Sequence, residues 1–213
     1  MLSIIDTGTG NLQSVANAFH RVGMETTIVE MSAELERAKA IALPGVGAFE
    51  HGMSALRDKG LIEPLRRRVN EDGVPLLGIC LGMQLLADAS EELGNFTGLG
   101  LIPGRVVRLE ATQTDYRVPN FGWHTVTPRR ASVLFANGTC GGSFYFAHSY
   151  HFRCDRAEDA AATIDFSGRR VTVAVERGNV FGVQFHPEKS QDAGLDVLER
   201  FVYHVRKGGP TGR

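Results

Sequence analysis

The sequence contains little cysteine, with only Cys80, Cys140 and Cys154 among its 213 residues. Three scattered cysteines are too few for a disulfide framework, and they do not have the paired spacing of metal ligands. We therefore expect no metal site and no cofactor. Cys140 and Cys154 are interpreted as free thiols without a chemical role, which leaves Cys80 to be explained.

Excess charge and long apolar runs are also lacking. The 23 Lys and Arg residues balance 24 Asp and Glu residues, for a formal net charge of −1, which gives no reason to expect nucleic acid or a membrane surface as a partner. No apolar run approaches the roughly 20 residues that span a bilayer. Residues 1–6 lack the basic start of a signal peptide. We expect a cytoplasmic protein.

The chain is long enough for one domain with a sizeable core, since 43% of its residues are hydrophobic. We expect that domain over residues 1–207 and a frayed tail at 208–213. Up to about residue 90, short apolar runs alternate with stretches of helical periodicity, which predicts a parallel sheet with helices on both faces. The predicted strands lie at 2–5, 25–30 and 38–43 and in a run ending at 80, and the predicted helices begin near 12, 51, 61 and 81.

The pattern changes at about residue 97 to short alternating runs separated by turn residues, which is typical of antiparallel hairpins. The expected fold class is therefore α/β, with an open, mostly parallel central sheet flanked by helices and an additional antiparallel β segment in the C-terminal half. The later runs lie near 105–109, 123–127, 143–147, 150–153, 160–165, 170–176 and 180–185, with Arg169 and Arg170 in a solvated turn and a final helix over about 193–205.

The first candidate for chemistry is Cys80, which lies between a predicted strand and a predicted helix that continues through Ala87. Gly78 and Gly82 flank it at equal spacing, as in a nucleophile elbow, because glycines permit a tight turn and close backbone approach. The N-terminus of the following helix favours a thiolate over a thiol. A buried cysteine with incidental glycines is the alternative.

Two further segments follow strand ends, where parallel sheets place their chemistry. The loop Pro44-Gly45-Val46-Gly47 has glycines that allow backbone N–H groups to turn toward an oxyanion, although a plain loop is the simpler interpretation. His186 follows the last predicted strand, and Glu188 is near enough to orient its imidazole. A cysteine nucleophile needs a base and an acid, and a histidine steered by a carboxylate supplies both.

The segment Gly8-Thr9-Gly10 after the first strand lacks the third glycine of a dinucleotide fingerprint. A phosphate site, a tight turn and an interaction loop all remain open for it.

Together, these motifs resemble those of class I, triad-type glutamine amidotransferases. The resemblance rests on the residues around Cys80 through Gln84 and on the run from Gln184 to Glu188, and it covers essentially the whole chain. More specifically, the chain resembles the glutaminase subunits of imidazole glycerol phosphate synthases in histidine biosynthesis. The other matching segments are residues 4–12, 43–49, 98–104, 146–150 and 186–190.

The resemblance implies a flavodoxin-like, three-layer fold and a role for each matching residue. Cys80 would attack the side-chain amide of glutamine, His186 would move the protons and Glu188 would orient it. The oxyanion would be held at Gly45, Val46, Gly47 and Leu81, glutamine by Gly45, Gly47, Gln84, Ser149 and Tyr150, and the partner by Asn11, Trp123 and Lys189.

The implied partner is a separate cyclase subunit, a (β/α)₈ barrel that forms a heterodimer with this chain, activates it and receives its ammonia through a channel. The chain departs from the family pattern at Asn120, His124 and Thr7. These departures leave room for a paralogous amidotransferase that supplies ammonia to another synthase, such as one that forms amidino sugars. A related cysteine hydrolase or peptidase and a non-catalytic binding module are the remaining alternatives.

Overall fold

The structure is a computed structural model that describes residues 1–135 and 142–208. Within this part of the chain, the main sheet has eight strands in the order β2-β1-β3-β4-β14-β13-β12-β9. In this order, neighbouring strands are parallel from β2 as far as β14 and antiparallel from β14 as far as β9. Their bounds are β1 Leu2–Ile5, β2 Thr26–Val29, β3 Ile41–Gly45, β4 Leu76–Cys80, β9 Thr127–Pro128, β12 Ala160–Phe166, β13 Arg169–Arg177 and β14 Val180–Val183.

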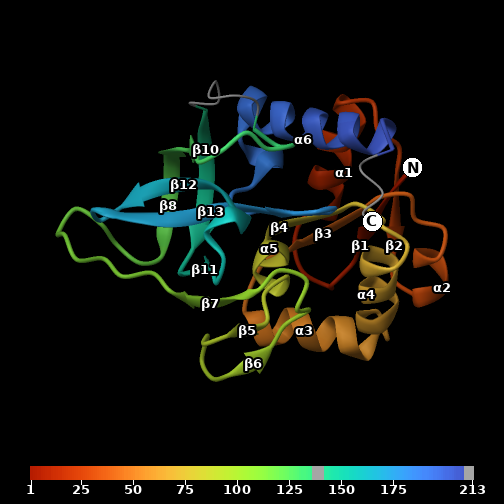
Figure 1. Ribbon diagram of the computed structural model, residues 1–213, viewed down its shortest axis with the longest axis horizontal. Coiled ribbons are helices and arrows are strands. Elements are labelled where there is room, and N and C mark those ends of the chain that lie inside the picture. Colours follow the sequence, from red (N-terminus) through yellow and green to blue (C-terminus); the bar gives the residue numbers. More distant parts are fainter. Residues whose placement is uncertain (136–141, 209–213) are drawn as a thin grey trace.

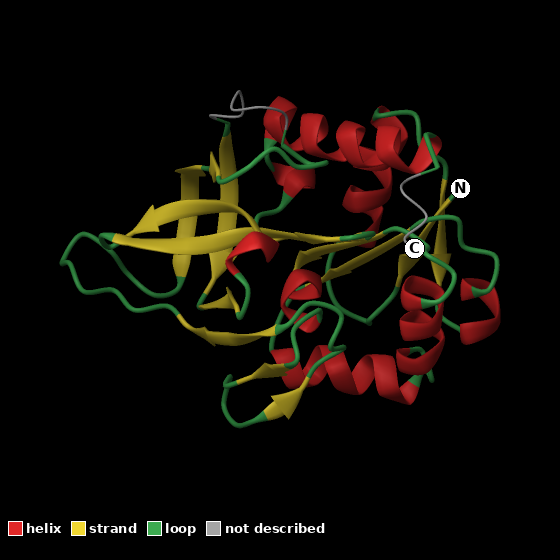
Figure 2. Cartoon of the chain, in the orientation of Figure 1, coloured by secondary structure: helices red, strands yellow, loops and turns green. Residues whose placement is uncertain are grey.

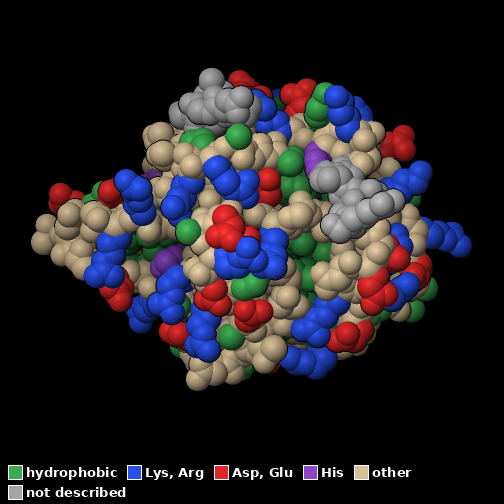
Figure 3. Space-filling model, in the orientation of Figure 1, with side chains coloured by type: hydrophobic (Ala, Val, Ile, Leu, Met, Phe, Trp, Pro, Cys, Tyr) green, Lys and Arg blue, Asp and Glu red, His purple; other side chains and the backbone are tan. Residues whose placement is uncertain are grey.

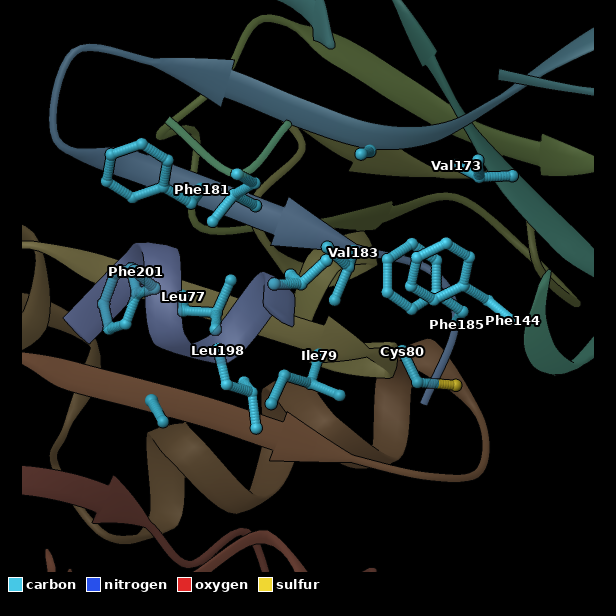
Figure 4. Packing of buried hydrophobic residues seen from close by; sticks show 14 of the residues in the cluster. Leu77, Ile79, Cys80, Phe144, Val173, Phe181, Val183, Phe185, Leu198 and Phe201 are labelled. Carbon is cyan, nitrogen blue, oxygen red and sulfur yellow. The ribbon is translucent and has the colours of Figure 1, made fainter. Parts of the chain in front are cut away.

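Helices cover both faces of the parallel half, which gives the expected three layers (Figures 1 and 2). Apolar stripes on α1 and α6 pack on one face, and those on α3 and α4 pack on the other. Figure 4 shows Leu198 and Phe201 of α6 against Leu77, Phe181 and Val183 of the sheet. The helices are α1 Leu12–Arg21, α2 Ser32–Leu35, α3 Phe49–Asp58, α4 Ile62–Asn70, α5 Leu81–Leu85 and α6 Gln191–Arg206, with 3₁₀ turns η1 Ala157–Asp159 and η2 Pro187–Lys189.

The antiparallel β structure of the C-terminal half is confirmed, and it is divided among three sheets. Strands β13, β12 and β9 extend the main sheet, β10 pairs with β8, and β11 joins β7, β5 and β6. This division places β10, with its partner β8, beside the segment that follows β14, where the backbone N–H of His186 donates to the carbonyl oxygen of Tyr145. The bounds are β5 Ala89–Ser90, β6 Phe96–Thr97, β7 Gly104–Arg108, β8 Asn120–Thr125, β10 Ser143–His148 and β11 Tyr150–Cys154.

One local prediction is wrong, because Arg169 and Arg170 begin strand β13 and do not lie in the turn. The turn consists of Ser167 and Gly168, both with positive φ, as a two-residue hairpin requires. Both arginines are exposed as expected, and Arg169 forms an ion pair with Glu110 at 2.5 Å.

Several expectations concern absences or lie partly outside the described residues. None of the described helices is long and apolar enough to cross a membrane. In the same residues, no cluster of three or more His, Cys, Asp or Glu could hold a metal ion. Figure 3 shows charges of both signs mixed over one face. Cys140 and most of the predicted tail lie outside the described residues, and the single domain over 1–207 stays a prediction.

Candidate active site

Cys80 lies at the junction of β4 and α5 in a strained backbone conformation, with φ 55° and ψ −110°. A non-glycine residue with positive φ is uncommon and typical of a nucleophile elbow. The two flanking glycines are required by packing. A Cβ on Gly78 would lie 2.6 Å from the carbonyl oxygen of Gly82, and one on Gly82 would lie 1.7 Å from that of Leu43. The predicted elbow geometry is therefore present.

The helix after Cys80 is shorter than predicted, because α5 ends at Leu85 and does not continue through Ala87. The loop at residues 99–102 folds back and donates its backbone N–H groups to the carbonyl oxygens of Leu85, Leu86 and Ala87. These carbonyls are then not available for another helical turn. A single turn aligns few peptide dipoles, so the macrodipole of α5 is small.

His186 reaches Cys80 because β14 and β4 are parallel neighbours, with Val183 paired to Ile79. The imidazole Nδ1 of His186 donates to Oε1 of Glu188 at 2.8 Å, and both side chains are only 5% exposed. The other carboxylate oxygen of Glu188 is buried and has no hydrogen-bond partner within residues 1–135 and 142–208. Its negative charge therefore acts on His186 with little screening.

The pKa of His186 follows from this environment. Burial lowers it, but hydrogen bonds to Cys80 and Glu188 and the charges of those two groups outweigh burial and raise the pKa to about 9. At neutral pH the imidazole therefore carries a proton beside the sulfur. By contrast, burial raises the pKa of the free Cys154 thiol to about 12, which makes that cysteine unreactive.

Most of the predicted glutamine and oxyanion residues lie around one cleft of about 290 Å³. A hollow of about 560 Å³ along α6 is larger but includes none of these side chains. The cleft is lined by Val46, Gly47, Cys80, Leu81, Gln84, Glu92, Pro119, Phe121, Ala147, His148, Ser149, Tyr150, His186 and Lys189.

The predicted oxyanion loop begins beside Cys80, since Gly45 pairs with Cys80 across β3 and β4. Gly47 has φ 102° and Val46 is 39% exposed, and both line the cleft. Gly45 is buried behind the side chain of Leu81 and does not line it. The oxyanion and glutamine-binding roles of these residues stay predictions.

Sequence patterns missed Glu92, an acidic residue of the cleft. Its Oε2 accepts the backbone N–H of Phe49, at the start of α3, at 2.6 Å. The only signal was a carboxylate a few residues beyond the elbow, and an acidic residue in a loop is ordinarily solvated.

The unusual residues Asn120 and His124 belong to a buried polar network that reaches the cleft. His124 Nε2 donates to Asn120 Oδ1 at 2.7 Å, and Asn120 Nδ2 donates to His148 Nε2 at 3.1 Å. His148 Nδ1 then donates to the carbonyl oxygen of Tyr150 at 2.8 Å. Burial lowers the pKa of His148 to about 4, so its imidazole is neutral. The two residues that depart from the family pattern, Asn120 and His124, are therefore hydrogen-bonded to each other.

The predicted partner residues lie at or near the cleft. Trp123 is 47% exposed and packs edge-on against Tyr145 at 6.0 Å, and the Lys189 ammonium lies 5.9 Å from the same ring. The Asn11 side chain accepts from Ser14 N–H at 3.0 Å and so caps α1, which contacts η2. Their partner role stays a prediction.

Comparisons with known proteins agree with this geometry. The model of the family "Glutamine amidotransferase class-I" matches residues 3–205. The chain is 43% identical to imidazole glycerol phosphate synthase subunit HisH of Chlorobaculum tepidum, over 95% of this chain and 99% of the relative. It is 46% identical to the same subunit of Moorella thermoacetica, over 99% and 98%.

A solved structure described as a glutamine amidotransferase has a similar fold. It superposes with a TM-score of 0.73 over 94% of this chain and 98% of its own, at 23% identity. The family match spans the elbow, the loop after β3 and the His186–Glu188 pair, so sequence and geometry lead to one conclusion: the chain belongs to the class I glutamine amidotransferases.

Proposed function

We propose that the protein is the glutaminase subunit of imidazole glycerol phosphate synthase, which hydrolyses glutamine to glutamate and ammonia. The observation that carries the proposal is the strained Cys80 beside the His186–Glu188 pair at the cleft. Identities of 43% and 46% to HisH subunits over nearly full length support the choice within the family.

The proposed reaction begins when the thiolate of Cys80 attacks the side-chain amide carbon of glutamine. Backbone N–H groups of Val46, Gly47 and Leu81 hold the oxyanion, and each such donor is worth about 10²–10³ in rate. The imidazolium of His186 gives its proton to the leaving nitrogen, which departs as ammonia. His186, now neutral, removes a proton from water, which attacks the thioester and releases glutamate.

The cleft offers groups of the right charge for the rest of the substrate. The carboxylate of Glu92 suits the α-ammonium of glutamine, and Lys189 suits its α-carboxylate. Gln84, Ser149 and Tyr150 also line the cleft and can supply polar contacts. We assign recognition of glutamine to these residues.

The proposed partner is a cyclase subunit, a (β/α)₈ barrel that forms a cytoplasmic heterodimer with this chain. It uses the ammonia to make imidazole glycerol phosphate and an aminoimidazole carboxamide ribotide. The exposed Phe121 and Trp123, 67% and 47% accessible, form an apolar surface at the cleft for this partner.

The test is glutamate release with and without the cyclase and its ribotide substrate. We expect slow hydrolysis by the free subunit, strong stimulation in the complex, and loss of at least about 10⁴-fold in Cys80→Ala. Cys154→Ala is the matched control and should retain activity. Full glutamate release by Cys80→Ala would refute the mechanism. An unstimulated wild type would instead favour a different ammonia-using synthase.

A further inference from the structure

Gln184 is fully buried beside Cys80. It is the first residue after β14, and its backbone N–H donates to the carbonyl oxygen of Val173 at 2.8 Å. Its side chain has two neighbours of different kinds. Nε2 lies 3.8 Å from the sulfur of Cys80, and Oε1 lies 2.9 Å from Nε2 of Gln84.

The orientation of both amides follows from a backbone carbonyl. Gln84 Nε2 also donates to the carbonyl oxygen of Tyr150 at 3.0 Å, and a carbonyl can only accept. Gln84 must therefore present N–H groups to both neighbours. Gln184 must then present Oε1 to Gln84, which leaves its own N–H group for the sulfur. The neutral His148 also donates to the carbonyl oxygen of Tyr150, at 2.8 Å, so two donors hold this carbonyl in place.

We propose that Gln184 is a positioning residue for the nucleophile, in addition to the three residues of the triad. Its N–H donates to the sulfur, holds the Cys80 side chain in one orientation and favours the thiolate. Through Gln84 it also ties the sulfur to a side chain that we assign to glutamine binding. This second role rests on the proposed function, whereas the contact with the sulfur does not.

The Gln184 side chain accepts a hydrogen bond through its oxygen and donates one through its nitrogen. Substitutions that remove one or both functions can therefore distinguish the proposed role from simple filling of the core. A methionine fills a similar volume, but its thioether is only a weak acceptor for Gln84 and has no donor for the sulfur. A glutamate retains the shape and the acceptor but replaces the donor with a negative charge beside a thiolate. If Gln184 only fills the core, neither substitution should change the chemistry of the cysteine.

The experiment measures the rate of Cys80 alkylation by iodoacetamide from pH 5 to 10, in full-length protein with Cys140 and Cys154 replaced by alanine. We expect Gln184→Met to lower the rate at pH 7 at least about threefold and to move the profile to higher pH, and Gln184→Glu to do so more strongly. Gln84→Met removes the hydrogen bond that holds Gln184 Oε1, so it should shift the profile less but in the same direction. Gln113→Met, at an exposed site away from the cleft, is the control.

The second readout is kcat/KM for glutamine in the complex, which we expect to fall about 10- to 100-fold in Gln184→Met, as for loss of a hydrogen bond to a charged group. Melting temperatures establish that each variant is folded. Alkylation profiles equal to wild type in folded Gln184→Met and Gln184→Glu overturn the proposal, whatever the activity. Because alkylation needs no glutamine turnover, an inactive wild type would count against the proposed function alone.

Discussion

Two buried histidines have pKa values that are shifted in opposite directions. His186 faces Cys80 and Glu188, whose hydrogen bonds and charges outweigh burial and raise its pKa to about 9. His148 faces an amide and a backbone carbonyl, so burial dominates and lowers its pKa to about 4. The same side chain is therefore a proton donor in one place and a neutral hydrogen-bonding link in the other.

At His186 we predict that Glu188→Gln lowers the pKa of the imidazole and reduces glutamine hydrolysis by about 10²-fold, as loss of a positioned charge would. The fall of the rate at high pH, expected near pH 9, should move to lower pH.

The same group contributes to stability. The pKa of His186 in the folded state lies above the ordinary 6.5, so the stabilising contribution of its proton is complete below pH 6.5 and is lost as the pH rises through 9. The variant should therefore be less stable than wild type at pH 6, with a smaller difference at pH 10. Urea denaturation and a pH–rate profile test both points, and an unmoved limb would contradict the assignment.

At His148 the dependence of folding stability on pH has the opposite sign. Its folded pKa lies below the ordinary value, so the unfolded chain binds the extra proton first and stability falls as the pH drops from 6.5 to about 4. The full loss is about 3 kcal/mol. We expect His148→Gln to have a flatter dependence than wild type when unfolding free energies are measured between pH 7 and 4.5. Parallel curves for the two proteins would show that His148 is not the group that titrates.

At the scale of elements, the site depends on how closely β3, β4 and α5 approach one another. Their contact leaves no room for a side chain at Gly78 or Gly82, and the strained Cys80 lies between these two positions. The short α5 follows from the same packing, because the loop after β6 takes the carbonyl groups that a longer helix needs. The elbow is therefore held by packing on both sides.

We predict that Gly82→Ala destabilises the protein by more than about 3 kcal/mol, since its Cβ would lie 1.7 Å from the carbonyl oxygen of Leu43 and backbone must move. For a chain of this size the melting temperature should fall by roughly 6–12 °C. Gly45→Ala is the matched control, because its Cβ would meet ordinary contacts at 3.4 Å or more and the melting temperature should change little. Equal melting temperatures for the two variants would refute this account of the elbow.

At the scale of the whole molecule, the parallel half carries the proposed chemistry and the antiparallel half walls the cleft. The carboxyl ends of β3, β4 and β14 bring together the loop after Gly45, Cys80 and His186. Strands β8 and β10 supply the other wall and, on their exposed side, Trp123. The cleft and the proposed partner surface are therefore built on the same strand pair.

We predict that Trp123→Ala weakens binding of the cyclase by about 2 kcal/mol or more, as expected for an aromatic anchor in an interface. Glutamine hydrolysis at saturating cyclase should be affected less than affinity. Tyr203→Ala is the control, because Tyr203 is 59% exposed on α6, outside the cleft. Titration calorimetry measures both affinities, and equal affinities for the two variants would place the partner elsewhere.

Local sequence alone determined the alternation of strands and helices, the elbow and the His186–Glu188 pair. Periodicity and glycine spacing act within a few residues, and the carboxyl ends of parallel strands converge wherever such a sheet forms. Only the tertiary structure decided that Glu92 and His148 line the same cleft as Cys80 and that Gln184 lies beside its sulfur. Gln84 and Gln184 are 100 residues apart, and Asn120 and His148 are 28 apart. Such pairs meet only through strand register and the packing of α5 on the sheet, because a buried amide or imidazole has no local signature of the partner that satisfies it.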